Sequence, residues 1–454
     1  MVSLSRAIYC KPFRPVCQGV CRKAADDGRF LPAVAPFSAK KGCVFFVYLL
    51  YYSGKNGKKE VKSVAYRVIL KKNEEKRVLA GHSWVYANEA ARIEGKDKNG
   101  SLAEVVAHDG RYIGKGYINH LSKILVRIFI RGQEEDGEEL YRERIAAAGS
   151  LREKLFDPAQ NNCYRLVFAE ADDLPALIID RYADYFVLEC LSLGVDQRKK
   201  MIADALVKLF SLKGIYMRGD VAVRKKEGLP LENELLYGEI PDKILVKENG
   251  LTMSVDVKNG QKTGYFLDQK ENRFAVRRYC RGASVLDCFC NSGGFSLNAA
   301  TVAREVTALD ISPFALENVE ENARLNGFTN IKTECADVFD ALRRYRAEGK
   351  KFGCVILDPP AFCKSAAEVK DAYRGYKDIN ISAMKLVEKG GFLITCSCSH
   401  YMTAPLFEKM LRESAQSCGR PVKILEVRVQ APDHPALLAA EETSYLKVFI
   451  LQVK

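Results

Sequence analysis

Short apolar runs alternate with segments of helical periodicity from about residue 260 to the end of the chain. The apolar runs cover residues 284–287, 306–310, 331–335, 354–358 and 392–398. This alternation is typical of a parallel sheet covered by helices. Two final apolar runs, 424–429 and 445–453, predict an antiparallel pair. The last 200 residues therefore favour an α/β domain with a largely parallel sheet.

One helix of this region carries its own start and stop signals. Ser312 is a suitable N-cap, Pro313 fits the first helical position, and Gly327 fits the C-cap. These signals predict a helix over residues 313–326.

The preceding sequence indicates two further domains. Residues 64–137 alternate apolar and polar positions, with a hairpin turn expected at 108–111, and predict a small β-barrel. Residues 138–258 predict an α+β middle domain that begins with a helix over 138–156. We also expect a helix over 197–210 and a hairpin of residues 176–180 and 185–189. The third domain then spans residues 259–454.

The first 63 residues form a basic leader that we expect to be disordered or to reflect a mis-assigned start. The chain has 70 Lys and Arg against 57 Asp and Glu, and residues 1–60 alone contribute 11 against 3. The remaining chain is therefore only +5, so charge by itself does not indicate nucleic acid. The apolar run 44–52 is much shorter than the roughly 20 residues that span a bilayer, and we expect no membrane segment.

Cysteine usage points to a reduced, cytoplasmic protein. The 15 cysteines form no regular framework, and several lie in or beside apolar strand-like runs. Cys10, Cys17 and Cys21 lack a second properly spaced pair, so we expect no metal site.

The first apolar run of the α/β domain breaks into a small-residue loop. Strand-ending Asp287 is followed by Asn291, Ser292, Gly293, Gly294 and Phe295, where a helix starts. Glycine permits close approach of a ligand, and free N–H groups at a helix start favour an anionic group. The loop departs from the G-x-G-x-x-G pattern of dinucleotide sites, so a nicotinamide oxidoreductase is disfavoured.

Two further acids extend this candidate cofactor site. Asp310 ends the next strand, where a carboxylate is suited to accept hydrogen bonds from ribose hydroxyls. Asp337 follows the third strand, where it would contact adenine or remain a solvated loop acid. An acid at 287 suits a cation better than a diphosphate. S-adenosylmethionine (SAM) combines a sulfonium, an amino group and a carboxylate, and it fits this mixed lining.

The fourth and fifth strands end in reactive groups. Asp358-Pro359-Pro360 places an acid at the carboxyl edge of the sheet, and Cys396 and Cys398 end the fifth strand on one face. A thiolate that adds to C6 of cytosine makes C5 nucleophilic enough to accept a methyl group. We assign this role to Cys398, with Asp358 close to the ring, and interpret Cys396 as a buried apolar residue. Methylation of an exocyclic amine is disfavoured because Ala361 follows the prolines and the aromatic Phe362 is displaced by one.

The chain from residue 65 onward resembles the large-subunit ribosomal RNA methyltransferase I family, which makes 5-methylcytosine. The most specific stretches are residues 168–182, 261–273, 287–295, 358–360 and 397–399. The resemblance implies an RNA-binding PUA barrel, an α+β domain and a Rossmann-like class I methyltransferase domain. It also selects Cys398 over Cys396.

The resemblance adds residues and raises doubts. It implies cofactor or substrate contacts by Lys262, Asp268 and Arg273, for which a salt-bridged surface turn is the alternative. Residues 433–435 and Lys447 either line the substrate side or are structural. Related 5-methylcytosine enzymes often carry a second cysteine, which helps to release the product, at the position of Ala361. In this chain the next cysteine, Cys363, is two residues further. His400 also stands where the family usually has glycine.

The sequence thus predicts a SAM-dependent enzyme that methylates C5 of cytosine in large-subunit ribosomal RNA. The first alternative is the same fold acting on another position, such as a guanine amine. The second is an RNA-binding protein without catalytic activity. RNA is the expected partner, and the target base must leave its stack to be methylated. A homodimer is possible from the sequence.

Overall fold

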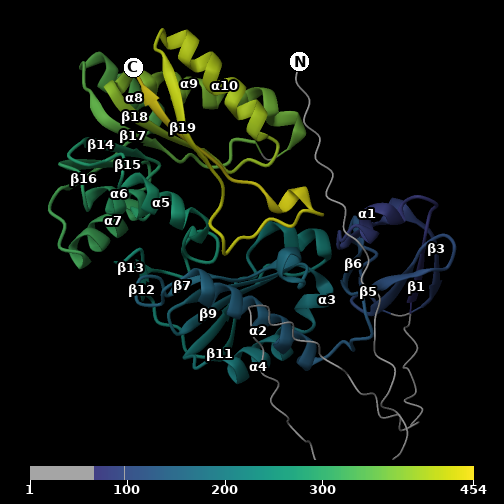
Figure 1. The fold of residues 1–454 in the computed structure, drawn as a ribbon. Coiled ribbons are helices and arrows are strands. Elements are labelled where there is room, and N and C mark those ends of the chain that lie inside the picture. Colours follow the sequence, from purple (N-terminus) through teal and green to yellow (C-terminus); the bar gives the residue numbers. More distant parts are fainter. Residues whose placement is uncertain (1–65, 97, 364) are drawn as a thin grey trace, which may run out of the picture. The chain divides into compact units, whose positions relative to one another are not determined.

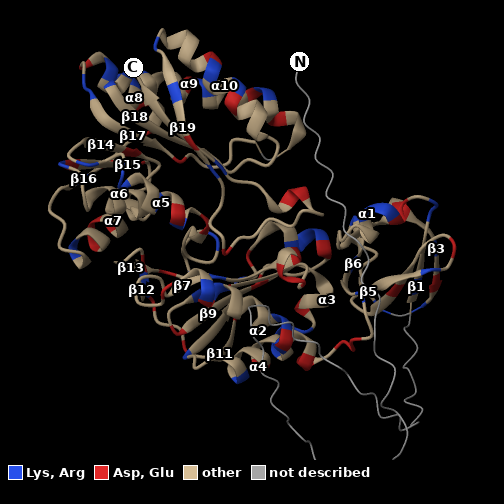
Figure 2. Ribbon diagram, viewed as in Figure 1, with Lys and Arg blue, Asp and Glu red and all other residues tan. Residues whose placement is uncertain are grey.

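The structure, a computed structural model, describes residues 66–454 apart from 97 and 364 (Figure 1). The expectations for residues 1–63, including their apolar run and three cysteines, lie outside the described residues. Among the described helices, none is long and apolar enough to cross a membrane. Opposite charges are interspersed along the surface helices, as on α10 (Ala404–Cys418) (Figure 2).

A six-stranded sheet forms where a small β-barrel was predicted. Its strands, in spatial order, are β2 (Trp84–Tyr86), β6 (Ile124–Ile130), β5 (Tyr112–Ile118), β4 (Leu102–Val106), β1 (Tyr66–Leu70) and β3 (Ala90–Gly95). The short helix α1 (Glu75–Leu79) follows β1. The predicted turn between β4 and β5 is confirmed, because Gly110 N donates to Ala107 O at 3.0 Å. Alternate side chains such as Val68, Leu70 and Val105 form its core.

The middle region is a five-stranded sheet covered by helices. The strand order is β11 (Glu234–Gly238), β10 (Gly214–Met217), β9 (Tyr185–Cys190), β8 (Leu177–Tyr182) and β7 (Cys163–Phe168). Helices α2 (Glu138–Leu155) and α4 (Lys199–Leu209) pack on it through Ile145 and Leu206, and α3 (Leu193–Asp196) precedes α4. The β8–β9 hairpin is tighter than predicted: Arg181 and Tyr182 continue β8, so the turn is Ala183-Asp184.

A short hairpin connects this region to the last sheet. Its strands are β12 (Ile244–Glu248) and β13 (Leu251–Val255). Short 3₁₀ turns occur at η1 (Ala87–Glu89), η2 (Ala169–Asp172), η3 (Ala222–Glu227), η4 (Leu267–Gln269), η5 (Ala366–Glu368) and η6 (Glu441–Thr443).

The last sheet has seven strands and confirms the predicted α/β class. Their order is β16 (Ile331–Cys335), β15 (Glu305–Asp310), β14 (Ser284–Cys288), β17 (Phe352–Leu357), β18 (Val387–Ser397), β20 (Lys447–Val453) and β19 (Val422–Arg428). The first five are parallel, and β20 is antiparallel to both neighbours. The order reverses between β14 and β17, and ligands of such sheets bind at the carboxyl ends of the strands around this reversal.

Helices cover both faces of this sheet. One core joins it to α8 (Val338–Ala347), α9 (Val369–Leu386) and α10, and another joins it to α5 (Lys270–Val276) and α6 (Gly294–Ala300). Helix α7 (Pro313–Leu325) is capped as predicted: Ser312 Oγ accepts from Ala315 N at 3.3 Å, and Gly327 has φ +68° after the end.

Candidate active site

The loop between β14 and α6 has an unusual backbone. Phe289, Asn291 and Gly293 have φ values of 63°, 49° and 84°. Only glycine adopts this left-handed region without cost, and side-chain-bearing residues held there concentrate at functional sites. The loop predicted from sequence is therefore a strained structure at the carboxyl end of the central strand.

Asp287, at the end of β14, is fully buried beside this loop. Its Oδ2 accepts a 2.6 Å hydrogen bond from Ser296 Oγ, whereas Oδ1 has no partner. Ser292 Oγ is also buried without a partner. Burial raises the pKa of Asp287 to about 7, and nearby Asp358 and Asp310 add to this rise. Buried polar atoms almost always have a partner, so these two atoms indicate a polar ligand, and the amino and carboxylate groups of SAM match them.

Asp310 ends β15 next to the loop. Its Oδ2 accepts from Asn291 N and its Oδ1 from Ser312 N, both at 3.0 Å. An ionised carboxylate has about four acceptor sites, so it can still accept two ribose hydroxyls. The adjacent Ile311 is 66% exposed, although it is large and apolar. The sequence analysis did not single out Ile311, and its exposed side chain forms an apolar surface beside Asp310.

Asp337 lies at the start of α8. Its Oδ1 accepts from Phe339 N at 2.8 Å and from Asp340 N at 3.2 Å. The residue is exposed and is the N-cap of the helix. The cap explains the acid at this position, and its contact with adenine stays a proposal.

Arg273 is buried and packs against Gly294 of the cofactor loop. Its Nε and Nη2 each lie 2.7 Å from a carboxylate oxygen of Glu248. A Cβ at Gly294 would lie 2.6 Å from Arg273 Cδ and 2.5 Å from Tyr265 Oη. The absence of a side chain at 294 is therefore what lets the loop rest on Arg273. This packing supports the loop, and a direct cofactor contact by Arg273 stays a proposal.

Asp358 follows β17 and is held by a side chain that the sequence analysis did not single out. Gln269 Nε2 donates to Asp358 Oδ1 at 2.9 Å, and Asn272 Nδ2 donates to Gln269 Oε1 at 2.8 Å. Burial and the negative Asp268 raise the pKa of Asp358 to about 6. Gln269 lies within the family-like stretch 261–273, which was the available signal.

The two cysteines of the fifth strand differ in environment. Cys396 is fully buried in the core between the sheet and α5. Cys398 lies one residue beyond β18; it borders that core but stays partly exposed. Burial and Asp358 raise the pKa of the Cys398 thiol to about 11, although Lys262 opposes the rise. The structure thus brings both thiols near Asp358 at neighbouring strand ends, and of the two only Cys398 is partly exposed.

Hydroxyl groups fix the chain on either side of Cys398. Tyr376 of α9 contacts Ser397 Oγ at 3.0 Å and Ser399 Oγ at 3.1 Å. Ser399 Oγ also accepts from Cys363 N at 3.2 Å. The Cys363 thiol itself donates to the Ser365 carbonyl. Segments after Pro360 and after Cys398 are therefore tied together, with Cys363 held in that structure.

Lys447 provides a buried amine beside Cys398. It opens β20 opposite Ser397, and its Nζ donates to Ser399 O at 2.6 Å and to Tyr445 O at 2.8 Å. Burial lowers the pKa of Lys447 to about 8, and the nearby Cys398 thiolate would raise it. An amine with this pKa can exchange protons near neutrality.

The segment 262–273 is joined to the C-terminal loop by buried charges. Asp268 Oδ2 accepts from Lys262 Nζ at 2.8 Å and from Tyr445 Oη at 2.6 Å, which holds the pKa of Asp268 below its usual range. Asp268 is 2% exposed, so the alternative of a surface turn is wrong for this residue. Its Oδ1 is buried without a partner and is available to a ligand.

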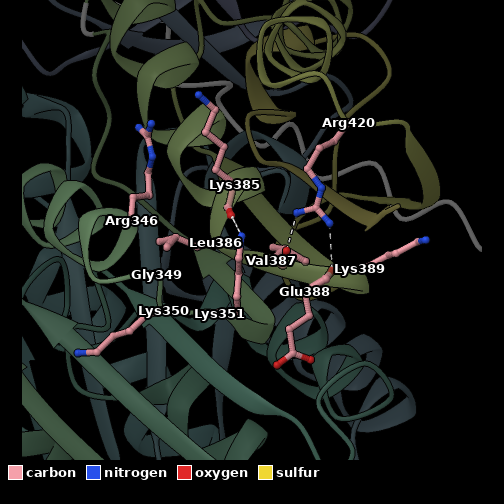
Figure 3. Close-up of a pocket in the computed structure, with 10 residues that line it drawn as sticks. All are labelled: Arg346, Gly349, Lys350, Lys351, Lys385, Leu386, Val387, Glu388, Lys389 and Arg420. Carbon is pink, nitrogen blue, oxygen red and sulfur yellow. Dashed lines mark hydrogen bonds between the residues drawn. The ribbon is translucent and has the colours of Figure 1, made fainter.

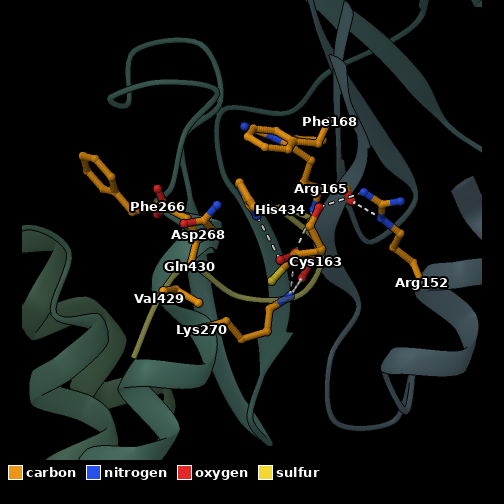
Figure 4. A network of polar contacts seen from close by, with 12 residues as sticks. Arg152, Cys163, Arg165, Phe168, Phe266, Asp268, Lys270, Val429, Gln430 and His434 are labelled. Atoms are coloured by element: carbon orange, nitrogen blue, oxygen red, sulfur yellow. Dashed lines mark hydrogen bonds and ion pairs between the residues drawn. The ribbon is translucent and has the colours of Figure 1, made fainter. Parts of the chain in front are cut away.

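A second buried cluster fixes the loop at residues 433–434 (Figure 4). Asp433 Oδ2 lies 3.4 Å from Lys270 Nζ and accepts from Arg165 N at 3.0 Å, and Asp433 Oδ1 lies 2.9 Å from His434 Nδ1. Lys270, Asp433 and His434 are almost completely buried. This enclosure favours the structural alternative for Asp433 and His434.

Comparison with known proteins matches this architecture. A model of the PUA-like domain matches residues 68–131, and a model of S-adenosylmethionine-dependent methyltransferases matches residues 221–447. A ribosomal RNA large subunit methyltransferase I from Shewanella amazonensis is 42% identical over 85% of this chain and 99% of its own length. The chain belongs to this methyltransferase family. The enzyme is 40% identical to the Klebsiella pneumoniae protein of the same name, over 85% of this chain and 98% of that protein.

Solved structures agree on the fold of the enzyme. A Streptococcus mutans protein described as a SAM-dependent methyltransferase superposes with a TM-score of 0.73, at 20% identity, over 85% of this chain and all of the other. A methyltransferase solved in complex with S-adenosylhomocysteine (SAH) gives a TM-score of 0.74 at the same identity and coverage. The enzyme thus has the class I methyltransferase fold, and its family identifies SAM as the cofactor.

Proposed function

We propose that the enzyme forms 5-methylcytosine in large-subunit ribosomal RNA, with Cys398 as nucleophile. The observation that carries this proposal is the difference in exposure between two thiols near Asp358: Cys398 is partly exposed at the strand end, whereas Cys396 is completely buried in core. The relatives at 40–42% identity bear the name ribosomal RNA large subunit methyltransferase I. A ribosomal RNA substrate also implies that the enzyme works in the cytoplasm.

SAM, when bound, supplies an electrophilic methyl group. Asp287 and Ser292 would hold its amino and carboxylate groups, Asp310 its ribose, and Asp337 with Ile311 its adenine. Asn291, Gly293, Gly294 and Phe295 shape the loop, and Arg273 supports it from beneath. Asp268, whose Oδ1 has no partner, would contact the cofactor or the substrate. Their positions around β14 and β15 fit the usual ligand crevice of such sheets.

Cys398 and its neighbours would carry the steps at the base. The Cys398 thiol loses its proton to the neutral Lys447 amine, and the sulfur adds to C6 of the flipped cytosine. Asp358, whose pKa is raised to about 6, can donate a proton to N3 as the C5–C6 electrons become available. C5 then takes the methyl group. Loss of the C5 proton to a base then expels the Cys398 thiolate from C6, and return of the N3 proton to the Asp358 carboxylate restores the neutral ring.

The position of Phe362 disfavours the amine alternative. Its ring centroid lies 4.7 Å from Tyr376 and 6.2 Å from Phe339, so the partly buried ring packs against the core under α9. These contacts disfavour a movement of the ring onto a target base, which an amine-methylating loop of this type requires.

Replacement of Cys398 by Ala tests the proposal. We expect 5-methylcytosine to disappear from ribosomal RNA incubated with this variant, as measured by nucleoside mass spectrometry. Calorimetry should show unchanged affinity for SAM, and Cys396→Ala should retain product formation. Methylation of a guanine amine that survives Cys398→Ala would support the first alternative. Failure of the unmodified enzyme to bind SAM would support the RNA-binding protein without catalysis.

A further inference from the structure

Helix α5 and edge strand β19 enclose a small hollow of about 230 Å³ next to the active site. Its lining includes Phe274, Arg277 and Arg278 from the helix region and Glu426 and Arg428 from the strand. None of these residues belongs to the cofactor or catalytic groups described above. The hollow is large enough for part of a nucleotide.

The lining combines an exposed ring with three arginines and two carboxylates, Glu271 and Glu426, and so has a net charge of +1. Phe274 is 50% exposed, and the Arg277 guanidinium lies 4.9 Å from its ring centroid. Arg278 and Arg428 share a single carboxylate, Glu426, at 3.4 Å and 2.8 Å. Arg277 donates to Asn298 Oδ1 and Asn249 O, which are neutral acceptors. An open aromatic face with arginines around it is the usual design for stacking a base and holding its phosphates.

A chain of hydrogen bonds connects this hollow to the catalytic carboxyl group. Arg428 Nε donates to Asn272 Oδ1 at 3.0 Å, Asn272 Nδ2 to Gln269 Oε1 at 2.8 Å, and Gln269 Nε2 to Asp358 Oδ1 at 2.9 Å. Only two side chains thus separate Arg428 from Asp358. Phe274 lies two residues after Asn272 on α5, about 3 Å along the helix axis at 1.5 Å per residue. A strand of RNA with its target at Asp358 would pass close to Phe274.

Another basic hollow, of about 570 Å³, has a different explanation (Figure 3). It lies where β17 and β18 begin, at the sheet edge opposite to Cys398. Lys351 donates to Lys385 O, and Arg420 to Met384 O, so these cations cap the C-terminal carbonyls of α9. Its lining residues include no aromatic side chain. It therefore lacks the stacking surface that distinguishes the hollow at α5.

We propose that the α5–β19 hollow binds a nucleotide of the RNA substrate that flanks the target cytosine. Its base stacks on Phe274, and Arg278 and Arg428 contact the adjoining phosphates. This inference rests on the proposed RNA substrate, but not on which atom of the target is methylated. The bound nucleotide would fix the register of the strand relative to Asp358.

The aromatic contact is tested with Phe274→Ala. We expect the affinity for in vitro transcribed large-subunit ribosomal RNA, measured by filter binding, to fall about 5- to 20-fold. The matched control is Phe314→Ala on α7, because Phe314 is 51% exposed and lies outside the hollow. The control should bind RNA as the unmodified enzyme does. Equal affinities for Phe274→Ala and the unmodified enzyme would overturn the stacking role.

The phosphate contact is tested with Arg278→Glu, whose side chain is 78% exposed and can change without disturbing the core. The slope of log affinity against log salt should become shallower by about 0.7 for each lost phosphate contact. Lys332→Glu makes the same charge change on β16, the opposite edge strand, where the side chain is 77% exposed. Identical slopes for the two variants would overturn the proposal.

Further measurements separate this inference from the proposed function. Affinity for SAM, measured by calorimetry, should be unchanged in Phe274→Ala and Arg278→Glu. If the unmodified enzyme methylates a position other than C5, the proposed function fails while the RNA affinities still test the hollow. A change in molecular mass by light scattering, with unchanged RNA affinity, would assign this face to self-association and overturn the RNA site.

Discussion

The side-chain amide of Gln269 donates a 2.9 Å hydrogen bond to Oδ1 of Asp358. The orientation of that amide is fixed, because its Oε1 accepts from Asn272. Gln269 follows Asp268 in the segment before α5, whereas Asp358 follows β17, so the bond joins two parts of the chain that are 89 residues apart. It sets the direction of the carboxyl group that lies near both thiols of the fifth strand.

Asp358→Asn should make the Cys398 thiol more reactive while it abolishes methyl transfer. The negative carboxylate helps to raise the pKa of Cys398 to about 11, so its removal lowers that pKa and increases the thiolate fraction at pH 8.5. Alkylation of Cys398 by iodoacetamide, followed by peptide mass spectrometry, should be faster in the variant. The exposed cap variant Asp337→Asn serves as control. Slower alkylation in Asp358→Asn would contradict the assigned electrostatics.

Cofactor affinity should depend on the ionisation of Asp287. Burial raises the pKa of Asp287 to about 7, and the SAM ammonium requires the ionised carboxylate. Below pH 7 the carboxyl group must lose a proton on binding, so affinity should fall by up to tenfold per pH unit. Calorimetry at pH 6 and pH 8, in buffers of different ionisation enthalpy, would detect the released proton. An affinity that is constant over this range, or no change in Asp287→Asn, would rule out this contact.

Lys447→Met should slow methyl transfer at pH 7.5 by about 100-fold, within the usual contribution of a general base. The pKa of Lys447 is lowered to about 8, so part of the amine is neutral at this pH and accepts the thiol proton. The deficit should shrink as the pH rises toward 10, because solvent then removes that proton. Lys447→Arg keeps the charge and hydrogen-bonding capacity but cannot become neutral, and it should be equally slow. Full activity of Lys447→Arg would show that Lys447 has only a structural role.

The buried pair of Lys270 and Asp433 should matter for stability. The two charged atoms lie 3.4 Å apart, and both residues are fully buried. Lys270→Met removes the cation and leaves a buried carboxylate, which typically costs about 3–5 kcal/mol of unfolding free energy. Urea unfolding should show this loss, and Lys270→Met with Asp433→Asn should recover part of it. The surface variant Lys332→Met should be within about 0.5 kcal/mol of the unmodified protein. If Lys270→Met lowered the unfolding free energy by only about 0.5 kcal/mol, the buried pair would not have the stabilising role expected of it.

Much of the fold was predictable because the apolar runs and helix-capping residues of the sequence match the strands and helices of the structure. Apolar runs at 306–310 and 331–335 became β15 and β16, and Ser312 with Gly327 delimited α7. Strand ends were less predictable: β18 begins at Val387, before the apolar run, because Val387 pairs with Phe352 of β17 ahead of a register shift that leads to the pair Cys354–Phe392. Likewise, Arg181 and Tyr182 are strand residues because their cross-strand partners complete the β8–β9 ladder.

The chemistry of the site was predictable in kind but not in its supporting contacts. The ends of β14, β15 and β17 brought Asp287, Asp310 and Asp358 to one edge, as the parallel pattern requires. The sequence could not reveal that Glu248 engages Arg273 or that Gln269 orients Asp358. These partners come from segments whose approach depends on the packing of the whole chain.

The central claim is that the Cys398 sulfur attacks the target base, and a covalent trap tests it most directly. Fluorine takes the place of the C5 proton and cannot be removed by a base, so the bond between sulfur and C6 should persist after methyl transfer. Incubation with SAM and large-subunit ribosomal RNA that contains 5-fluorocytosine should give a denaturation-resistant protein–RNA complex. The complex should form with Cys396→Ala but not with Cys398→Ala. Active enzyme that forms no such complex, or a complex that persists in Cys398→Ala, would contradict the account.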